Sequence, residues 1–155
     1  MADERRHTAG VIAPPPLIYV GALGLGLLAE WLLPGAELPV AFTWVGIAVI
    51  ALGLSIDVWF TISLRRARTP VNPYSPTAAL VTSGPYAFSR NPAYVGMAVI
   101  FVGIALVAEA PWTLLALPLA LLAIDRGVIK REEPYLEQLF GAEYVHYKSR
   151  TRRWL

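Results

Sequence analysis

The stretch Gly84–Gly96, GPYAFSRNPAYVG, holds side chains that a simple connector before an apolar run does not need. Arg90 carries a planar fork of donors that suits a carboxylate or a phosphate. Asn91 both donates and accepts hydrogen bonds, and Tyr86 and Tyr94 offer flat faces with hydroxyl groups. These groups indicate a ligand site, although tyrosine and arginine also gather where a loop meets lipid headgroups.

Prolines brace the segment around this stretch. They are Pro70, Pro73, Pro76, Pro85 and Pro92. Each fixes one backbone angle and removes a donor, and each disfavours helix at the residue before it. We therefore expect a stiff loop that presents its groups to a ligand with little loss of conformational freedom. Gly84 and Gly96 would let the backbone approach that ligand closely.

A second candidate site lies in the C-terminal stretch VIKREEPYLEQLFGAEYVHYKSRTRRWL. Glu132 and Glu133 are adjacent, so on a helix they point about 100° apart. One carboxylate can then face a ligand while the other pairs with Lys130 or Arg131. Apolar and aromatic residues follow at spacings of three and four, which predicts an amphipathic helix. They are Tyr135, Leu136, Leu139, Phe140, Tyr144 and Tyr147.

The same stretch also fits a helix that breaks at Gly141 and lies on the membrane surface. In that interpretation the basic residues near the C-terminus meet anionic lipid. They are Lys148, Arg150, Arg152 and Arg153. This alternative accounts poorly for the pair of glutamates.

The elements that must position these groups are strongly apolar. Hydrophobic residues make up 56% of the 155 residues and charged residues 15%, which is typical of a membrane protein and not of a soluble domain. There is no cysteine, so disulfides and thiolate chemistry are excluded. With only His7 and His146, we expect no histidine-based metal site. The polar start MADERRHTAG gives no sign of a cleavable signal peptide.

Four apolar runs are suited to crossing a bilayer as helices, at about 17–33, 40–64, 92–108 and 112–126. They predict an all-α integral membrane fold with four transmembrane helices in one domain, residues 1–155. Residues 127–155 would form a helical tail.

The charges predict which way this bundle faces. Every lysine and arginine precedes the first run, separates the second from the third, or lies at or beyond the end of the fourth. The other two loops carry only Glu37 and Glu109. Because basic residues favour the cytoplasmic side, we expect both termini, the tail and the site there, at the inner membrane in a bacterium.

Asp57 stands inside the second predicted span. An ionisable residue within a membrane span indicates a functional site. It can also pair with Arg65, two turns further along the same helix. Both roles remain open at this point.

The two candidate sites together resemble a known superfamily. GPYAFSRNPAYVG resembles the G-P-Y…R-H-P-x-Y-x-G motif of the isoprenylcysteine carboxyl methyltransferase and phospholipid methyltransferase superfamily. REEPYLEQLFGAEYVHYKSRTRRWL resembles its second motif, a Glu–Glu pair followed by F-G-x-x-Y-x-x-Y and a basic, aromatic end. The motifs follow in the same order, separated by a helical hairpin, over roughly the last 85 residues. The resemblance implies an integral membrane methyltransferase that uses S-adenosylmethionine.

The resemblance also implies a cofactor pocket at the cytoplasmic ends of the last two spans and the tail. Arg90 suits the cofactor's carboxylate, and Glu132 or Glu133 its ammonium and hydroxyl groups. We expect catalytic roles for Arg90 and Asn91. The residues expected to bind the cofactor are Tyr86, Arg90, Asn91, Pro92, Tyr94, Gly96, Glu132, Glu133, Leu136 and Tyr144.

Asn91 departs from the family pattern, which usually has histidine at this position. Asparagine keeps hydrogen bonding but cannot titrate near neutral pH. If the histidine holds the cofactor, little changes. If it acts as a base, this chain lacks that base or uses a nucleophile that needs none.

The expected partners are membrane lipids and a lipophilic acceptor, either an isoprenylcysteine-like carboxylate or a phospholipid-like amine. No nucleic acid is expected, and the oligomeric state is left open. Arg65, Arg66 or Arg150 can orient an anionic acceptor. One alternative is a nicotinamide-dependent membrane reductase of the sterol-reductase type. The other is a small four-span transporter with Glu30 as the coupling carboxylate, against which the long loop between the second and third runs argues.

Overall fold

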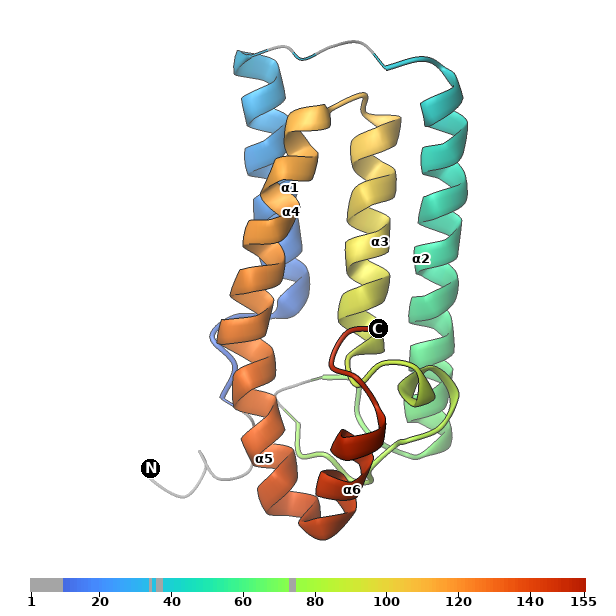
Figure 1. The fold of residues 1–155 in the computed structure, drawn as a ribbon, viewed down its shortest axis with the longest axis vertical. Coiled ribbons are helices and arrows are strands. Elements are labelled where there is room, and N and C mark those ends of the chain that lie inside the picture. Colours follow the sequence, from blue (N-terminus) through green and yellow to red (C-terminus); the bar gives the residue numbers. More distant parts are fainter. Residues whose placement is uncertain (1–9, 34, 36–37, 73–74) are drawn as a thin grey trace.

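The computed structural model describes residues 10–33, 35, 38–72 and 75–155 as an upright bundle of helices (Figure 1). The bundle helices are α1 (Pro15–Leu32), α2 (Ala41–Arg66), α3 (Pro92–Val107) and α4 (Pro111–Ile124). A short 3-10 turn, η2 (Gly84–Ala87), precedes α3, and a π-helical turn, η3 (Asp125–Ile129), follows α4. The tail helices are α5 (Lys130–Phe140) and α6 (Ala142–Arg150). No strand occurs within the described ranges.

The helix lengths confirm an all-helical protein of membrane type. α1, α2 and the continuous helix Pro111–Phe140 are each long and apolar enough to cross a membrane, whereas α3 is shorter, at 16 residues. The predicted spans 17–33, 40–64 and 92–108 agree with α1 to α3 within two residues at each end. The helix that begins at Pro111 continues through η3 into α5, past the predicted end of the fourth span at 126. Three sequence features named above lie outside the described residues: residues 1–9 with His7, Glu37, and Pro73.

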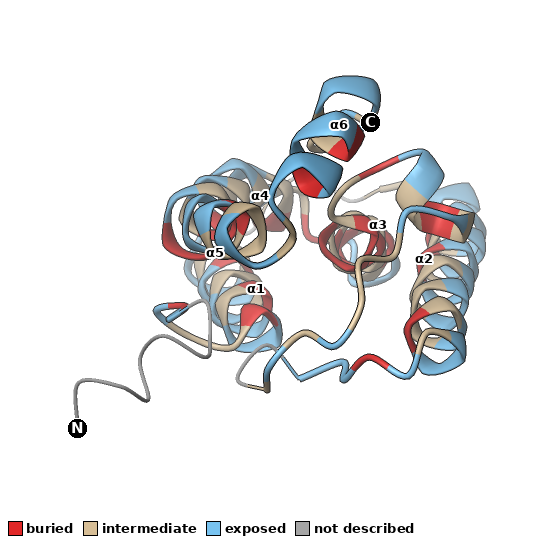
Figure 2. Ribbon diagram, turned by 90° about the horizontal axis from the view of Figure 1, so that it is seen from below, coloured by how far each residue is buried: buried red, intermediate tan, exposed pale blue. Residues whose placement is uncertain are grey.

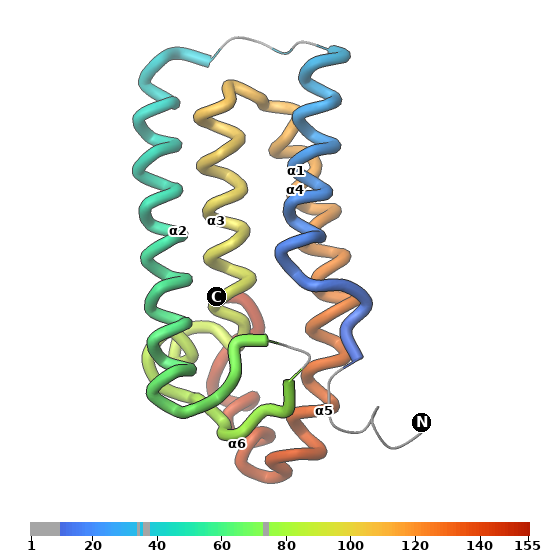
Figure 3. The backbone as a smooth tube through the Cα atoms, turned by 180° about the vertical axis from the view of Figure 1, so that it is seen from behind, coloured from blue at the N-terminus to red at the C-terminus, as the bar shows by residue number. Residues whose placement is uncertain are grey.

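The bundle is built from two closely packed helix pairs. α2 lies along α3 and α1 along α4, and α3 contacts α4 between the pairs (Figures 1 and 3). A Cβ on Gly53 would lie 2.9 Å from the carbonyl oxygen of Gly96, and one on Gly46 would lie 2.7 Å from that of Gly103. These four glycines, spaced by seven on each helix, let the two backbones approach closely. Seen along the bundle axis, buried residues gather on α3 (Figure 2).

The turn η3 changes which residues of the last long helix share a face. Asp125 and Glu133 are eight residues apart, which in an uninterrupted α-helix separates them by about 80° in direction. The extra residue of a π-helical turn reduces this to about 20°. The backbone N–H of Ile12 donates to the carbonyl oxygen of Gly127 inside this turn, at 3.2 Å. Because the π-helical turn places them on nearly the same side of the helix, Asp125 and Glu133 face the same neighbouring segment.

The tail folds back against the start of α3. Gly141 has φ 54°, a left-handed value that glycine adopts at little cost, and it ends α5 as the sequence predicts. α6 then turns back, and the last residues run beside the lower end of α3 (Figure 1). The segment just before α3 and the C-terminus of the chain are thereby brought together.

Glu30 has a structural role at the other end of the bundle. Its carboxylate accepts hydrogen bonds from the backbone N–H of Gly35, at 2.6 Å, and of Trp112, at 3.2 Å. Trp112 is in the first turn of α4, where helix N–H groups lack partners of their own. These contacts favour a capping role over the coupling carboxylate of a transporter.

Candidate functional site

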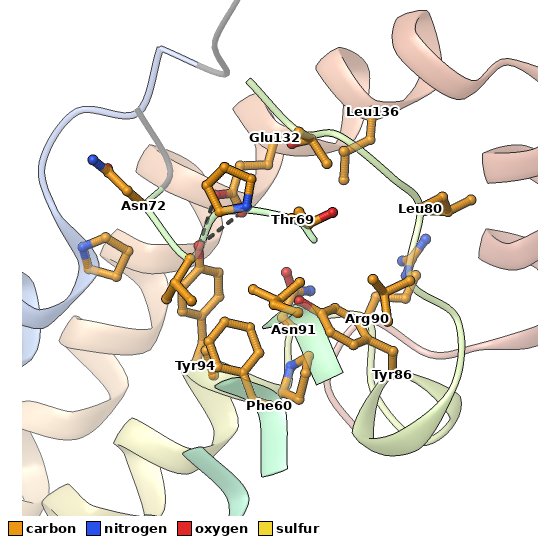
Figure 4. A pocket seen from close by; sticks show the side chains of 18 of the residues that line it. Phe60, Thr69, Asn72, Leu80, Tyr86, Arg90, Asn91, Tyr94, Glu132 and Leu136 are labelled. Carbon is orange, nitrogen blue, oxygen red and sulfur yellow. Dashed lines mark hydrogen bonds between the residues drawn. The ribbon is translucent and has the colours of Figure 1, made fainter. Parts of the chain in front are cut away.

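A cavity of about 660 Å³ lies between the end of α2, the loop that follows it, the start of α3, and α5 with α6. Its volume is typical of small-molecule sites. All the predicted cofactor-binding residues except Gly96 line it. They are Tyr86, Arg90, Asn91, Pro92, Tyr94, Glu132, Glu133, Leu136 and Tyr144. Figure 4 shows several of these side chains around the central space, together with Phe60, Thr69, Asn72 and Leu80.

The local sequence explains how the first motif reaches this position. Gly84 has φ 65°, and a Cβ there would lie 2.8 Å from the hydroxyl oxygen of Ser63 in α2. Glycine therefore allows η2 to begin tightly against α2. Pro92 starts α3, where its missing N–H has no intrahelical partner in any case. Tyr94 lies in this first turn and Arg90 just before it, and both line the cavity.

Glu132 meets the cavity without a cation beside it. The hydroxyl of Tyr94 donates to both carboxylate oxygens, at 2.9 Å each (Figure 4). None of the ion pairs within the described ranges includes Glu132. The hydroxyl of Tyr19 in α1 donates to the carbonyl oxygen of Tyr94, at 2.9 Å, and fixes that residue's backbone. A partly buried carboxylate in this state is suited to a cationic or hydroxyl-bearing ligand.

Glu133 is held between two arginines. Arg153 binds it at two points, Nε to Oε1 at 3.0 Å and Nη2 to Oε2 at 2.7 Å. Arg90 reaches it with Nη2 alone, at 3.1 Å from Oε1. The Nη1 of Arg153 also donates to Asp125, at 3.0 Å. The Nε and Nη1 of Arg90 are buried without a hydrogen-bond partner, so they remain available to an anionic group.

Hydrogen bonds to backbone carbonyl oxygens join the first motif to the C-terminal segment. The N–H of Arg90 donates to the carbonyl oxygen of Arg152, at 2.9 Å. Asn91 Nδ2 donates to the carbonyl oxygen of Arg153, also at 2.9 Å, and the Ser89 hydroxyl donates to the same oxygen at 3.3 Å. Asn91 is therefore engaged in holding the C-terminal segment.

The tyrosines of the tail and of η2 keep their hydroxyl protons at neutral pH. Burial, and then the charge of Glu133, raises the pKa of Tyr144 to about 12. Burial is also the main cause that raises the pKa of Tyr86 and of Tyr147. Tyr147 donates to the carbonyl oxygen of Tyr86, at 2.7 Å. The phenol of Tyr147 thus holds the tail on the loop, and none of the three phenols can act as a base near pH 7.

Gly96 and Asp57 lie together away from the cavity lining. A Cβ on Gly96 would overlap Oδ1 of Asp57, so this glycine makes room for α2 and not for a ligand. Asp57 Oδ1 is buried and has no hydrogen-bond partner. The described ion pairs contain no Asp57–Arg65 contact, so the pairing considered from the sequence does not form.

Two further ion pairings differ from the expectation. Lys130 pairs with Asp125, at 3.3 Å, and Nη1 of Arg131 donates to the carbonyl oxygen of Gly10, at 3.0 Å. Neither contacts the glutamate pair. The three basic residues considered for an anionic acceptor are outside the cavity lining: Arg65, Arg66 and Arg150.

Sequence reasoning missed Arg153 and Asp125 as parts of the site. Arg153 was grouped with the basic residues that meet anionic lipid, yet its guanidinium turns inward to Glu133. Asp125 lies just before the predicted tail. The contribution of α2, such as Phe60, was also missed because it belongs to no motif.

The sequence pattern of one family matches most of this chain. The pattern described as phospholipid methyltransferase covers residues 41–143, from the start of α2 into α6. The chain belongs to the phospholipid methyltransferase family. This confirms the resemblance seen in the two motifs.

Similar proteins carry a related name. Protein-S-isoprenylcysteine O-methyltransferase of Homo sapiens is 32% identical over 114 residues, which cover 70% of this chain and 40% of the human protein. The protein of that name from Saccharomyces cerevisiae is 35% identical over 72 residues, covering 46% of this chain and 30% of the yeast protein. An uncharacterized protein of Haemophilus influenzae is 54% identical over 35 residues, covering 23% of this chain and 56% of that protein. The chain thus spans between 30% and 56% of the length of these relatives. No solved structure matches it significantly.

Proposed function

We propose that this protein is a membrane-embedded methyltransferase that moves a methyl group from S-adenosylmethionine to a lipophilic acceptor. One observation carries the proposal. A single cavity presents Arg90, with two unpartnered donors, and Glu132, a carboxylate without a counter-ion. Family membership supports methyl transfer over the reductase alternative.

The residues of the cavity fit the chemical groups of S-adenosylmethionine. The fork of Arg90 suits its carboxylate, and Glu132 suits its ammonium or hydroxyl groups. Aromatic and apolar side chains such as Leu136 and Tyr144 suit its adenine. When bound, it would supply a methyl group attached to a positively charged sulfur.

The chain's own contribution is to hold and orient the reactants and to exclude water. Alignment of two reactants can supply much of the rate of a direct displacement. Asn91 cannot titrate and is bonded to the C-terminal segment, so it offers no base at this position. The acceptor must then bring a nucleophile that is already deprotonated, such as a carboxylate or a neutral amine.

The acceptor class follows from the lining and from the relatives. The part of the lining from α2 and its loop is largely apolar and includes Phe60, Leu64 and Leu80, which suits a lipid chain. The named relatives suggest an isoprenylcysteine-like carboxylate, and the family description suggests a phospholipid-like amine.

The basic residues at this end of the bundle support a cytoplasmic site. An impermeant thiol reagent can test this on a Ser149→Cys variant, because the chain has no cysteine of its own. Labelling in intact cells would contradict a cytoplasmic site.

Calorimetric titration of the purified protein in detergent tests the cofactor. We expect S-adenosylmethionine and its demethylated product to bind the unmodified protein, and Glu132→Gln to weaken binding about tenfold or more, because a charge-assisted contact is lost. Glu137→Gln is the matched control, since Glu137 pairs with Lys148 outside the cavity lining. A folded protein that binds neither compound would refute the proposal.

A further inference from the structure

The carboxylate of Glu133 is shared unequally between two arginines. Arg153 occupies both oxygens with Nε and Nη2, at 3.0 and 2.7 Å. Arg90 makes one contact, from Nη2 to Oε1 at 3.1 Å. Glu133 is only 7% exposed, so water competes little for its oxygens. The carboxylate is thus largely satisfied by Arg153.

This unequal sharing determines which hydrogen-bond donors of Arg90 remain available to a ligand. An arginine and a carboxylate prefer two parallel hydrogen bonds when nothing else competes. Because Arg153 already fills that arrangement, Arg90 keeps Nε and Nη1 unpartnered within the cavity wall. Without Arg153, Glu133 would attract the whole fork of Arg90, and those donors would no longer face a ligand.

Asp125 fixes the orientation of Arg153. The carboxylate of Asp125 accepts a hydrogen bond from Nη1 of Arg153, at 3.0 Å. Nη1 lies on the side of the guanidinium opposite the two nitrogens that bind Glu133. The turn η3 brings Asp125 and Glu133 onto nearly one face of the long helix, as described above. The guanidinium of Arg153 is therefore held at both ends.

The side chain of Arg153 is separable from the anchoring of the C-terminal segment. That segment is also tied down by its backbone, through the carbonyl oxygens of Arg152 and Arg153. Truncating the Arg153 side chain leaves these bonds in place. Its loss should then act mainly on the charges around Glu133.

We infer that Arg153 is a positioning residue of the proposed cofactor site, which holds Glu133 so that Arg90 stays free to bind the carboxylate of S-adenosylmethionine. The inference rests on the proposed function. Arg153 itself does not line the cavity; it acts through Glu133 on Arg90.

The test is a double-mutant cycle read by calorimetric binding of S-adenosylhomocysteine in detergent. We expect Arg153→Ala to weaken binding about tenfold or more. In a Glu133→Gln background, the same change should weaken binding less than about threefold, because a neutral amide no longer draws Arg90 away. Arg150→Ala is the matched control, since Arg150 is exposed in the same tail and contacts His146; it should bind as the unmodified protein does.

A second measurement needs no ligand. An arginine-selective dicarbonyl reagent, followed by peptide mass spectrometry, reports how readily Arg90 is modified. We expect slower modification of Arg90 in Arg153→Ala than in the unmodified protein, because Glu133 then engages its free donors. Unchanged melting temperature and unchanged Arg150 modification serve as controls for folding.

The outcomes separate the two claims. Equal losses of binding in both backgrounds, or an unchanged rate of Arg90 modification, would overturn the role of Arg153. If the unmodified protein binds no S-adenosyl compound, the proposed function fails. The modification rate of Arg90 then decides alone whether Arg153 keeps the donors of Arg90 free.

Discussion

Asn91 occupies the motif position where the family usually has histidine, and its side-chain nitrogen donates to the carbonyl oxygen of Arg153 at 2.9 Å. Its backbone N–H is bonded to the Ser89 hydroxyl, at 3.1 Å. Both contacts lie within the junction between the loop and the C-terminus. At this scale, the partners of the side chain point to positioning and not to proton transfer.

Replacing Asn91 by leucine tests that role. The change keeps a similar size and removes the donor, so about 1 kcal/mol of stability should be lost. For a chain of this length that corresponds to a fall of about 2–4 °C in melting temperature. The Asn91→His variant retains a ring N–H donor and should lose less stability than the leucine variant. Thermal unfolding in detergent measures both, and a leucine variant that melts like the unmodified protein would show that the bond is unimportant.

For some single residues, type and spacing predicted that the side chain lies at a cavity. Arg90 and Glu132 were identified by type and spacing, and both line the cavity. The inward direction of Arg153 was not predictable, because the residue lies beyond the end of α6, outside any helix or strand. No helical or strand periodicity assigns a face to such a residue.

At the scale of elements, close contact between α2 and α3 positions the first motif. Gly53 packs so tightly that an added Cβ would lie 2.6 Å from Ile100 Cγ1 and 2.9 Å from the Ile100 backbone nitrogen. The motif residues stand at the start of α3 and the loop leaves the end of α2. The separation of the two helices therefore sets the width of the cavity.

Gly53→Ala should accordingly destabilise the protein. Overpacking of a close helix contact costs about 1–3 kcal/mol, because the backbones must move apart. Gly21→Ala in α1 is the matched control: a Cβ there meets nothing within 4 Å, and alanine is the better helix former by about 0.5–1 kcal/mol. Thermal unfolding followed by tryptophan fluorescence compares the two. Equal melting temperatures would contradict the close packing of α2 on α3.

The helices themselves follow from the apolar runs, but the turn η3 does not. The segment Asp125–Ile129 contains no proline or other residue that forces a π-helical turn. Its unusual hydrogen bonding depends on contacts from far along the chain, such as that of Ile12 to Gly127. Tertiary contacts of this kind leave no local signal in the sequence.

At the scale of the whole molecule, the chemistry gathers at one end of an apolar bundle. The long sides of α1 and α2 expose large apolar residues such as Leu25, Trp44 and Leu52, as expected for helices that face lipid. Figure 1 shows the segments that line the cavity at the end where the tail folds back, and Figure 4 shows Arg90 and Glu132 within the cavity wall. A charged cofactor can thus be held next to the region where a lipid acceptor resides.

Transfer of a tritiated methyl group from S-adenosylmethionine to lipid tests this account most directly. The purified protein is placed in phosphatidylethanolamine vesicles, with and without an S-farnesylcysteine derivative, and label is counted in the organic phase. We predict label with the unmodified protein and with Glu137→Gln, and little with Glu132→Gln. A folded protein that binds S-adenosylmethionine but labels neither acceptor would contradict the proposed activity.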